Sequence, residues 1–195
     1  MAIRGESIRA MHPLFQEGEG GSIPTSPLSM RVETIPFLRA KELNRKWHSR
    51  LARFGTGAVE KMSFPSFAAV HGGKVYAVAI WSHPVARNLP QHTWLELRRM
   101  AIAPDAPRMT ASWMLGVMVR LIRKSRPETE TLVSYHDTEV HSGCIYKAAG
   151  WTATSINRDG NWSRPGRYRP KAQSEAPKQR WELNLFRPTT NKSSK

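Results

Sequence analysis

The sequence predicts an α/β domain in which helices flank a mixed central sheet. Strand-like and helix-like segments alternate along the chain, which is the pattern of α/β proteins. Segments 111–125 and 141–150 have helical character, and each lies between two strand-like segments, so crossover connections are expected. The apolar content of 39% and the length of 195 residues suit one domain with tails.

The first part of the domain is expected to form a strand, a helix and a hairpin. The segment MRVETIP, residues 30–36, has the character of a short strand. Over residues 37–51 apolar side chains recur at helical spacing, largely on one side. In 66–82 two apolar runs flank Gly72 and Gly73. Two glycines between such runs are a turn signal, so this segment is expected to be a β-hairpin.

Four strands and two helices are expected after the hairpin. The predicted strands are 92–104, 130–135, 151–157 and 180–186, and the predicted helices are 111–125 and 141–150. Ser112 is expected to cap the first of these helices or to lie in its first turn, and Gly150 is expected to end the second. A long polar insertion, residues 158–179, separates the last two strands.

The predicted domain boundaries follow composition. Residues 1–28, rich in Gly, Ser, Pro and Glu, are expected to be a flexible arm, 29–187 the catalytic domain and 188–195 a basic tail. No run of about 18 apolar residues predicts a transmembrane helix, and no apolar stretch near the N-terminus resembles a signal peptide. The single cysteine, Cys144, excludes a disulfide within the chain and a cysteine-rich zinc site. A cytoplasmic location is therefore expected.

The charge predicts a polyanionic partner. The formal net charge is +15 and the pI is about 10.8, and the basic residues are not confined to the tail. A late basic group is interleaved with Trp162 and Tyr168, a mixture that suits phosphate contact combined with base stacking. DNA is favoured over a membrane surface because no lipidation motif or strongly amphipathic basic helix is present. The plainer alternative is a basic tail that only aids solubility.

The segment RRMAIAPDAPRMTASWML is a candidate anion site. A predicted strand leads through a loop to the start of a helix, where free N–H groups and the helix dipole favour a phosphate. Arg108, Thr110 and Ser112 would add donors. The loop contains no glycine and no Gly-Lys-Ser/Thr, so it is not a Walker P-loop. An ordinary strand-to-helix turn explains the pattern equally well.

Asp137 and Tyr146 are the candidate catalytic pair. Asp137 lies just past a predicted strand and Tyr146 lies on the helix that follows. Loops beyond strand ends carry ligand sites in α/β folds, and a tyrosine hydroxyl can donate a proton to a leaving thiolate or alkoxide. The structural alternative is that Asp137 caps the next helix and that Tyr146 belongs partly to the core.

The neighbouring reactive side chains have plainer explanations. His136 and His141 with Asp137 do not form a recognised zinc signature, so no metal site is predicted. Cys144, one turn from His141, would form a nucleophile pair with it or, more commonly, be a small buried cysteine. His48, at the end of the first helix, is a candidate general base or simply a surface histidine.

The order of elements and the ending Tyr146-Lys147-Ala148-Ala149-Gly150-Trp151 resemble the GNAT acetyltransferase fold. The resemblance implies a GNAT-like mixed sheet flanked by helices, with acetyl-CoA as the cofactor. It also implies that a loop–helix junction holds the coenzyme A pyrophosphate and that Tyr146 protonates the coenzyme thiolate. The usual loop, Arg/Gln-x-x-Gly-x-Gly/Ala, is replaced by RMTASW, residues 108–113.

A narrower resemblance is to the Mom-type DNA modification proteins of phages. It is carried by LELRRMAIAPDAPRMTASWMLG, residues 95–116, and LVSYHDTEVHSGCIYKAAGW, residues 132–151. Those GNAT-like proteins convert adenine in DNA to N6-carbamoylmethyladenine, which shields phage DNA from restriction. By position, the resemblance implies catalytic roles for Asp137, Tyr146 and His48. It implies cofactor-side roles for Arg99 and Ser112. The other candidate cofactor-binding residues are Arg108, Ala101 and Ile102.

Two rival functions stay open at this stage. One is a conventional acetyl-CoA-dependent N-acetyltransferase acting on an amine of a protein or small molecule. The other is a DNA-binding protein with a degenerate GNAT fold and no catalysis, an alternative motivated by the missing loop glycines. The donor of the carbamoylmethyl group, any metal requirement, the DNA context and the oligomeric state, a homodimer included, are not predicted by the sequence.

Overall fold

The computed structural model describes residues 23–48, 64–157 and 176–186. The strands are β1 (Arg31–Thr34), β2 (Ser66–His71), β3 (Lys74–Ser82), β4 (Trp94–Ile102), β5 (Thr131–Asp137), β6 (Thr152–Asn157) and β7 (Lys178–Asn184). The helices are α1 (Phe37–Trp47), α2 (Thr110–Ser125) and α3 (Cys144–Ala148), preceded by the 3-10 turn η1 (Pro27–Ser29). Among the described residues, no helix is both long and apolar enough to cross a membrane.

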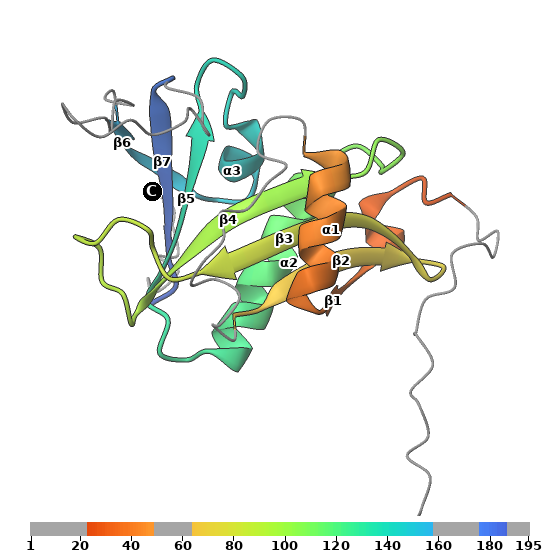
Figure 1. Cartoon of the computed structure of the whole chain (residues 1–195), viewed down its shortest axis with the longest axis horizontal. Coiled ribbons are helices and arrows are strands. Elements are labelled where there is room, and N and C mark those ends of the chain that lie inside the picture. Colours follow the sequence, from red (N-terminus) through yellow and green to blue (C-terminus); the bar gives the residue numbers. More distant parts are fainter. Residues whose placement is uncertain (1–22, 49–63, 158–175, 187–195) are drawn as a thin grey trace, which may run out of the picture.

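The strands form one mixed sheet, which confirms the predicted fold class. Its order is β1-β2-β3-β4-β5-β7-β6, and β4 and β5 are the parallel neighbours while the other pairs are antiparallel. The helix α2 supplies the crossover between β4 and β5 (Figure 1). After α3, β6 runs parallel to β5, with β7 inserted between them.

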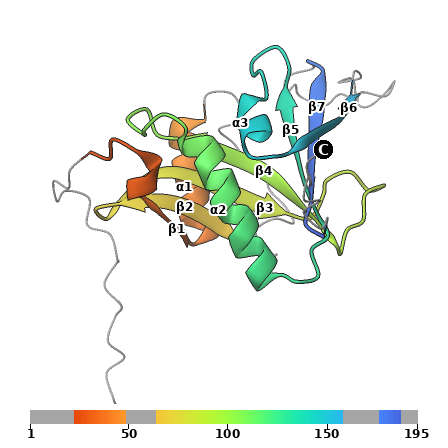
Figure 2. The ribbon, with the colours of Figure 1, turned by 180° about the vertical axis from the view of Figure 1, so that it is seen from behind.

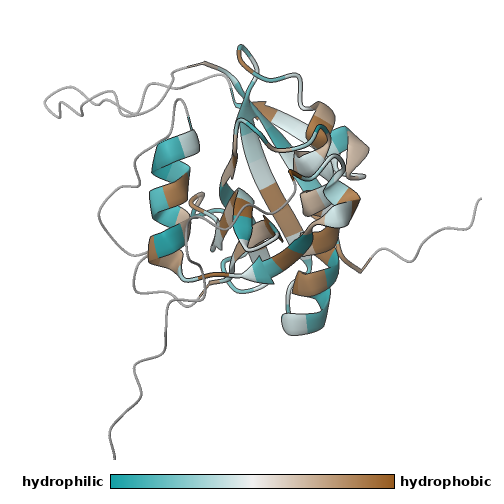
Figure 3. Cartoon of the chain, turned by 90° about the vertical axis from the view of Figure 1, so that its right-hand side faces the viewer, coloured by the Kyte–Doolittle hydropathy of each residue, from teal (hydrophilic) through white to brown (hydrophobic). Residues whose placement is uncertain are grey.

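The two long helices cover opposite faces of the sheet (Figures 1 and 2). Under α1, Ala40 and Leu43 pack on Val78 and Ile80 of β3. On the other face, α2 contributes a set of fully buried side chains, namely Met114, Leu115, Met118 and Ile122. In Figure 3, α1 is mainly hydrophilic, whereas α2 carries more hydrophobic surface. The more polar helix therefore leaves a large charged surface exposed.

The central strands β4 and β5 separate to form a fork. They pair only over Trp94–Leu97 and Thr131–Ser134. Beyond these residues β4 continues along β3 as far as Ile102, while β5 continues along β7 as far as Asp137. The divergence is visible in Figure 1, where β5 leaves the direction of β4. We call this opening between the carboxyl halves of β4 and β5 the fork.

A β-bulge in β4 changes which side chains of this strand point to the α1 face of the sheet and which point to the α2 face. Ile80 of β3 is opposite Arg99, but the next residue, Trp81, is opposite Leu97, so Arg98 is the extra residue. Leu97 packs with the core on the α2 side, whereas Ala101 packs under α1. Because side chains alternate along a strand, the extra residue turns Arg99 toward the α1 side.

Several sequence-based expectations need correction or lie outside the described part. The predicted helix 141–150 is only the five-residue α3, and Leu38, assigned to the apolar side of the first helix, is 70% exposed. Residues 1–22 of the predicted arm, the tail 188–195, and Trp162 and Tyr168 of the late basic group lie outside the described residues. The hairpin turn is confirmed, since Gly72 and Gly73 both have positive φ between β2 and β3.

Candidate active site

Tyr146 places its hydroxyl at the apex of the fork. The Tyr146 hydroxyl oxygen lies 2.9 Å from Ser134 Oγ, and the Ser134 hydroxyl donates to the Leu97 carbonyl at 3.3 Å. Either hydroxyl can be the donor in the bond between Tyr146 and Ser134. Leu97 and Ser134 are the last paired residues of β4 and β5. Three groups from β4, β5 and α3 therefore meet where the two strands separate.

The segment after Tyr146 fixes it in place. Gly150 has φ of 79°, and its N–H donates to the Lys147 carbonyl at 3.1 Å while the Trp151 N–H donates to the Tyr146 carbonyl at 2.9 Å. This pair of bonds is a Schellman motif, which commonly brings an apolar contact between the same residues. The Trp151 and Tyr146 rings do meet, edge to face, with centroids 5.7 Å apart. The Ala-Ala-Gly-Trp sequence is thus the helix stop that positions the tyrosine.

Two further aromatic residues enclose Tyr146. The Trp181 ring of β7 stacks on Tyr146 with centroids 5.3 Å apart, and the His136 ring of β5 stacks at 6.0 Å. Trp181 Nε1 donates to His136 Nδ1 at 2.7 Å, so the neutral His136 carries its proton on Nε2. Burial lowers the pKa of His136, which favours this neutral form. The stack therefore holds Tyr146 between rigid, uncharged partners.

Burial keeps Tyr146 protonated. Its side chain is only 6% exposed, and burial raises its pKa although the hydrogen bond with Ser134 acts in the opposite direction. A neutral hydroxyl can donate a proton but is a weak base. The apex of the fork thus holds a neutral hydroxyl, while the ring belongs more fully to the core than the sequence predicted.

Asp137 lies on the other face of β5 from Tyr146. Ser134 and His136 face Tyr146, so the alternation along the strand turns Asp137 away. Its Oδ1 accepts a hydrogen bond from the Glu139 N–H at 3.0 Å, and its carbonyl accepts from the N–H groups of Val140 and His141. Asp137 therefore shapes the turn after β5 rather than capping α3, and strand β5 lies between its side chain and Tyr146.

His48 and Arg99 lie on the α1 side of the fork, where the Arg99 charge acts on His48. His48 caps the C-terminal end of α1, with its N–H donating to the Asn44 carbonyl at 2.8 Å. Its pKa is lowered by burial and by the charges of Arg99 and His141. Burial, together with neighbouring Arg98, lowers the pKa of Arg99 to about 10. The lowered pKa of His48 favours its neutral form near pH 7, while Arg99, with a pKa of about 10, remains charged.

The start of α2 differs from a simple serine-capped helix. The residue before the helix, Met109, has φ of 69°, a left-handed conformation unusual for a side chain that is not glycine. The Thr110 hydroxyl donates to the Pro107 carbonyl at 2.7 Å, and the Ser112 hydroxyl donates to the Met109 carbonyl at 3.1 Å. Ser112 is thus a first-turn residue and not the N-cap, and Arg108 beside it is exposed.

The other two predicted cofactor-side residues lie on opposite faces of β4. Ala101 is 3% exposed and packs under α1, whereas Ile102 is partly buried on the α2 side. Neither position brings a polar side chain to the fork. Their backbone, on the β4 edge beyond Leu97, is what borders the opening.

Sequence reasoning missed Ser134, Trp181 and Glu96. The carboxylate of Glu96 is buried, accepts a hydrogen bond from the Val85 N–H at 2.8 Å and lies 3.4 Å from Arg98 Nε. Burial raises its pKa. A carboxylate within the apolar run WLEL was the available signal for Glu96, whereas only the strand pairing brings Ser134 to Tyr146.

The structure places the residues of the metal and cysteine alternatives as follows. No group of three or more His, Cys, Asp or Glu side chains able to hold a metal occurs among the described residues. Cys144 is exposed and is the first residue of α3, with His141 in the preceding loop. The expectation of a buried cysteine is therefore wrong.

Solved structures with a similar fold are acetyltransferases. The ribosomal-protein-S18-alanine N-acetyltransferase from Escherichia coli is 16% identical, with a TM-score of 0.54 over 85% of this chain and 99% of that chain. The acetyltransferase from Bacillus subtilis in complex with CoA is 13% identical, with a TM-score of 0.56 over 80% and 99%. An N-acetyltransferase from Staphylococcus aureus Mu50 is 9% identical, with a TM-score of 0.56 over 80% and 97%. The chain has the fold of the GNAT acetyltransferases.

The sequence comparison identifies the family. Among curated proteins none matches the sequence significantly. The profile of the Mom protein family matches residues 29–179, a range that contains β4, α2, β5 and α3 and therefore both arms of the fork with Tyr146. On this match the chain belongs to the Mom protein family.

Proposed function

We propose that the protein is a transferase that converts adenine in DNA to N6-carbamoylmethyladenine and so protects phage DNA from restriction. The observation that carries the proposal is the Mom family match over residues 29–179. The net charge of +15 supports the proposal. An enzyme that binds DNA needs positive charge to contact the phosphates, whereas an acetyltransferase of small molecules does not.

Two features suit the coenzyme part of an acyl-CoA donor. From Arg99 to Ile102, the β4 edge that borders the fork has no neighbouring strand in the described part of the chain. Its amides are open to pairing with an extended, amide-containing chain such as pantetheine. The first turn of α2, beside the exposed Arg108, suits a phosphate. Two proteins of similar fold were solved with CoA and with acetyl-CoA.

The glycine-free loop does not argue against this fit. The backbone conformation at Met109, with φ of 69°, is one that glycine adopts most readily. The loop therefore reaches a glycine-like geometry without a glycine, at a cost of about 1 kcal/mol. Strain of this kind is often kept where a ligand binds. Acetyl-CoA would supply an activated acyl group when bound.

The proposed roles of the side chains concern binding and proton transfer. Tyr146 would hold a proton at its hydroxyl and deliver it to a leaving group at the apex of the fork. Neutral His48 would accept a proton from the adenine amino group. The target base must leave the helical stack to reach either residue. Because the new bond joins nitrogen to a CH2 carbon, the reaction is not a simple acetyl transfer and needs a carbamoylmethyl donor with a leaving group on that carbon. The N6–CH2 bond forms as the bond from CH2 to the leaving group breaks, the proton lost by N6 passes to His48, and the leaving group takes a proton from Tyr146.

The decisive experiment is a nucleoside analysis. The protein is expressed with a plasmid in bacteria, and the plasmid DNA is digested to nucleosides and analysed by mass spectrometry. A fraction of the deoxyadenosine is expected at the mass of the carbamoylmethyl derivative. An entirely unmodified adenine pool, with soluble protein present, would contradict the proposal.

A conventional N-acetyltransferase is the second candidate, and the fold match to N-acetyltransferases favours it. It differs in predicting acetyl-CoA-dependent acetylation of an amine in the absence of DNA. Incubating the protein with labelled acetyl-CoA, with and without DNA, separates the two functions. Label transferred to amines without DNA would favour the second candidate.

We expect two substitutions of Asp137 to distinguish the contribution of its negative charge from that of the hydrogen bond that shapes the turn. Asp137→Asn keeps an oxygen that can accept from the Glu139 N–H but removes the carboxylate. Because the charge is lost, modified adenine is expected to fall by about 100-fold or more, while the unfolding free energy changes by less than about 1 kcal/mol. Asp137→Ala removes both features and is expected to lose product and some stability. Full activity of Asp137→Asn would reduce the residue to a structural role.

A further inference from the structure

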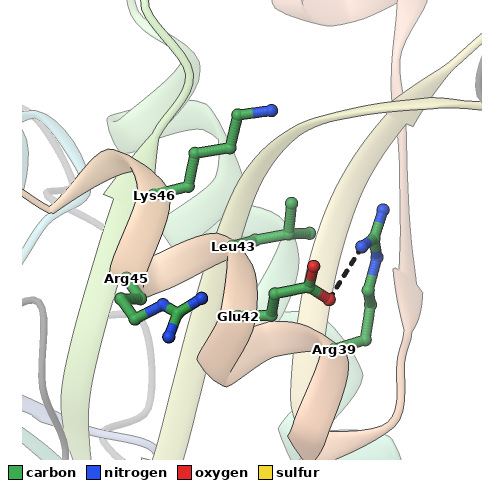
Figure 4. A pocket seen from close by; sticks show the side chains of 5 residues that line it. All are labelled: Arg39, Glu42, Leu43, Arg45 and Lys46. Carbon is green, nitrogen blue, oxygen red and sulfur yellow. Dashed lines mark hydrogen bonds and ion pairs between the residues drawn. The ribbon is translucent and has the colours of Figure 1, made fainter.

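The last turn of α1 carries a basic surface next to the fork. Arg45 and Lys46 are both exposed, and a hollow of about 280 Å³ is lined by Arg39, Glu42, Leu43, Arg45 and Lys46. Figure 4 shows Arg45 and Lys46 extending from the same turn, with Glu42 facing Arg39 nearer the start of the helix. We call Arg39, Arg45 and Lys46 the α1 basic surface.

The carboxylate that lines this hollow, Glu42, is already paired with a positive charge. Glu42 Oε2 lies 2.9 Å from Arg39 Nη1 in an ion pair, and it is the lining residue with a carboxylate. No ion pair involves Arg45 or Lys46 within the described ranges 23–48, 64–157 and 176–186. Two uncompensated cations therefore remain at the C-terminal end of the helix, where they face solvent.

The position of this surface connects it to the candidate active site. Arg45 and Lys46 lie three and two residues before His48, and Trp47, which follows Lys46, packs against the core cluster that contains Ala101 of β4. The C-terminal end of α1 thus borders the fork on the face where Arg99 points. A base extruded from DNA carries its two flanking phosphates to the mouth of the pocket that receives it. Cations at that mouth are placed to meet them.

We propose that the α1 basic surface contacts the DNA backbone beside the target adenine, an inference that rests on the proposed function. Its ligand is the phosphate of the nucleotides flanking the extruded base, held by Arg45 and Lys46. Phosphate contacts of this kind position the substrate without reading its sequence. The surface is therefore expected to contribute affinity and register, and not the choice of base.

The test compares two matched double variants. Arg45→Gln with Lys46→Gln removes two charges from the last turn of α1. Arg123→Gln with Lys124→Gln removes two exposed charges from the last turn of α2, at the opposite end of the molecule from α3 (Figure 2). Binding of a fluorescent DNA duplex is measured by anisotropy across a range of salt concentrations, and modified adenine is measured by mass spectrometry.

The α1 variant is expected to show a salt dependence shallower by about 2 in log K against log salt, because two phosphate contacts are lost. Its KM for DNA should rise while kcat is retained, and the α2 variant should behave as the unaltered protein. Equal binding by the α1 variant and the unaltered protein, or an equal loss in both variants, would overturn the inference. If the unaltered protein binds DNA through this surface but forms no modified adenine, the proposed function fails and the binding surface stands.

Discussion

Replacing Tyr146 by Phe is expected to lower the yield of modified adenine by about 10²–10⁴-fold, the usual contribution of a positioned proton donor. The change removes the hydroxyl at the apex of the fork but keeps the ring that stacks on Trp181 and His136. Ser134 keeps its bond to the Leu97 carbonyl. The loss in unfolding free energy should therefore be about 1 kcal/mol. Nucleoside mass spectrometry and urea denaturation measure the two effects separately.

Ser134→Ala is the matched control for this substitution. It removes the same hydrogen bond from the other side but leaves the Tyr146 hydroxyl available at the apex. If Tyr146 is the proton donor, the Ser134 variant should lose far less product than the Tyr146 variant, at a similar cost in stability. Comparable product from both variants would show that the tyrosine hydroxyl is structural. It would then favour a DNA-binding protein whose chemistry lies elsewhere.

The sequence predicted the elements well because each has strong local signals. The helical spacing of 111–125 became α2, the two glycines became the hairpin turn, and the Gly150 stop became the end of α3. The parallel pairing of β4 with β5 also followed, since a helix between two strands implies a crossover. These features depend on residues close together in the chain, so local patterns were sufficient.

The site was less predictable because it depends on register. The fork exists because pairing of β4 with β5 stops at Leu97 and Ser134, and no local pattern shows where pairing stops. The bulge at Arg98 reverses the direction of Arg99, and strict alternation would have placed that side chain on the other face. In the same way, Asp137 and Tyr146 were predicted as a pair from their places after a strand and on the next helix, and register decides that the Asp137 side chain lies on the face of β5 away from Tyr146.

Gly143 explains why the predicted helix is so short. The residue has φ of 73° and is the N-cap of α3, so the chain cannot be helical through 141–143. A Cβ atom at this position would lie 2.4 Å from Trp181 Cζ2 and 2.9 Å from His136 Cε1. Glycine is thus required both by the backbone conformation and by the close approach of the Trp181–His136 pair. The sequence showed the glycine but not the two rings against it.

Gly143→Ala should accordingly lower the unfolding free energy by about 3 kcal/mol, combining the left-handed backbone penalty with overpacking. The added methyl group must displace Trp181 or His136, and so break the 2.7 Å bond between them. Because Trp181 also stacks on Tyr146, product formation should fall even at temperatures where the variant is folded. Urea denaturation and nucleoside analysis provide the two measurements.

Gly73→Ala and Gly150→Ala isolate the steric part of that effect. Both residues have φ near 80°, but no heavy atom lies within 4 Å of the Cβ that each would gain. Each variant should therefore lose only the backbone penalty of about 1 kcal/mol. The excess loss at Gly143 then measures the contact with Trp181 and His136. If all three variants lose the same unfolding free energy, Trp181 and His136 move aside at little cost. The aromatic packing around Tyr146 would then be easily displaced, which contradicts this prediction.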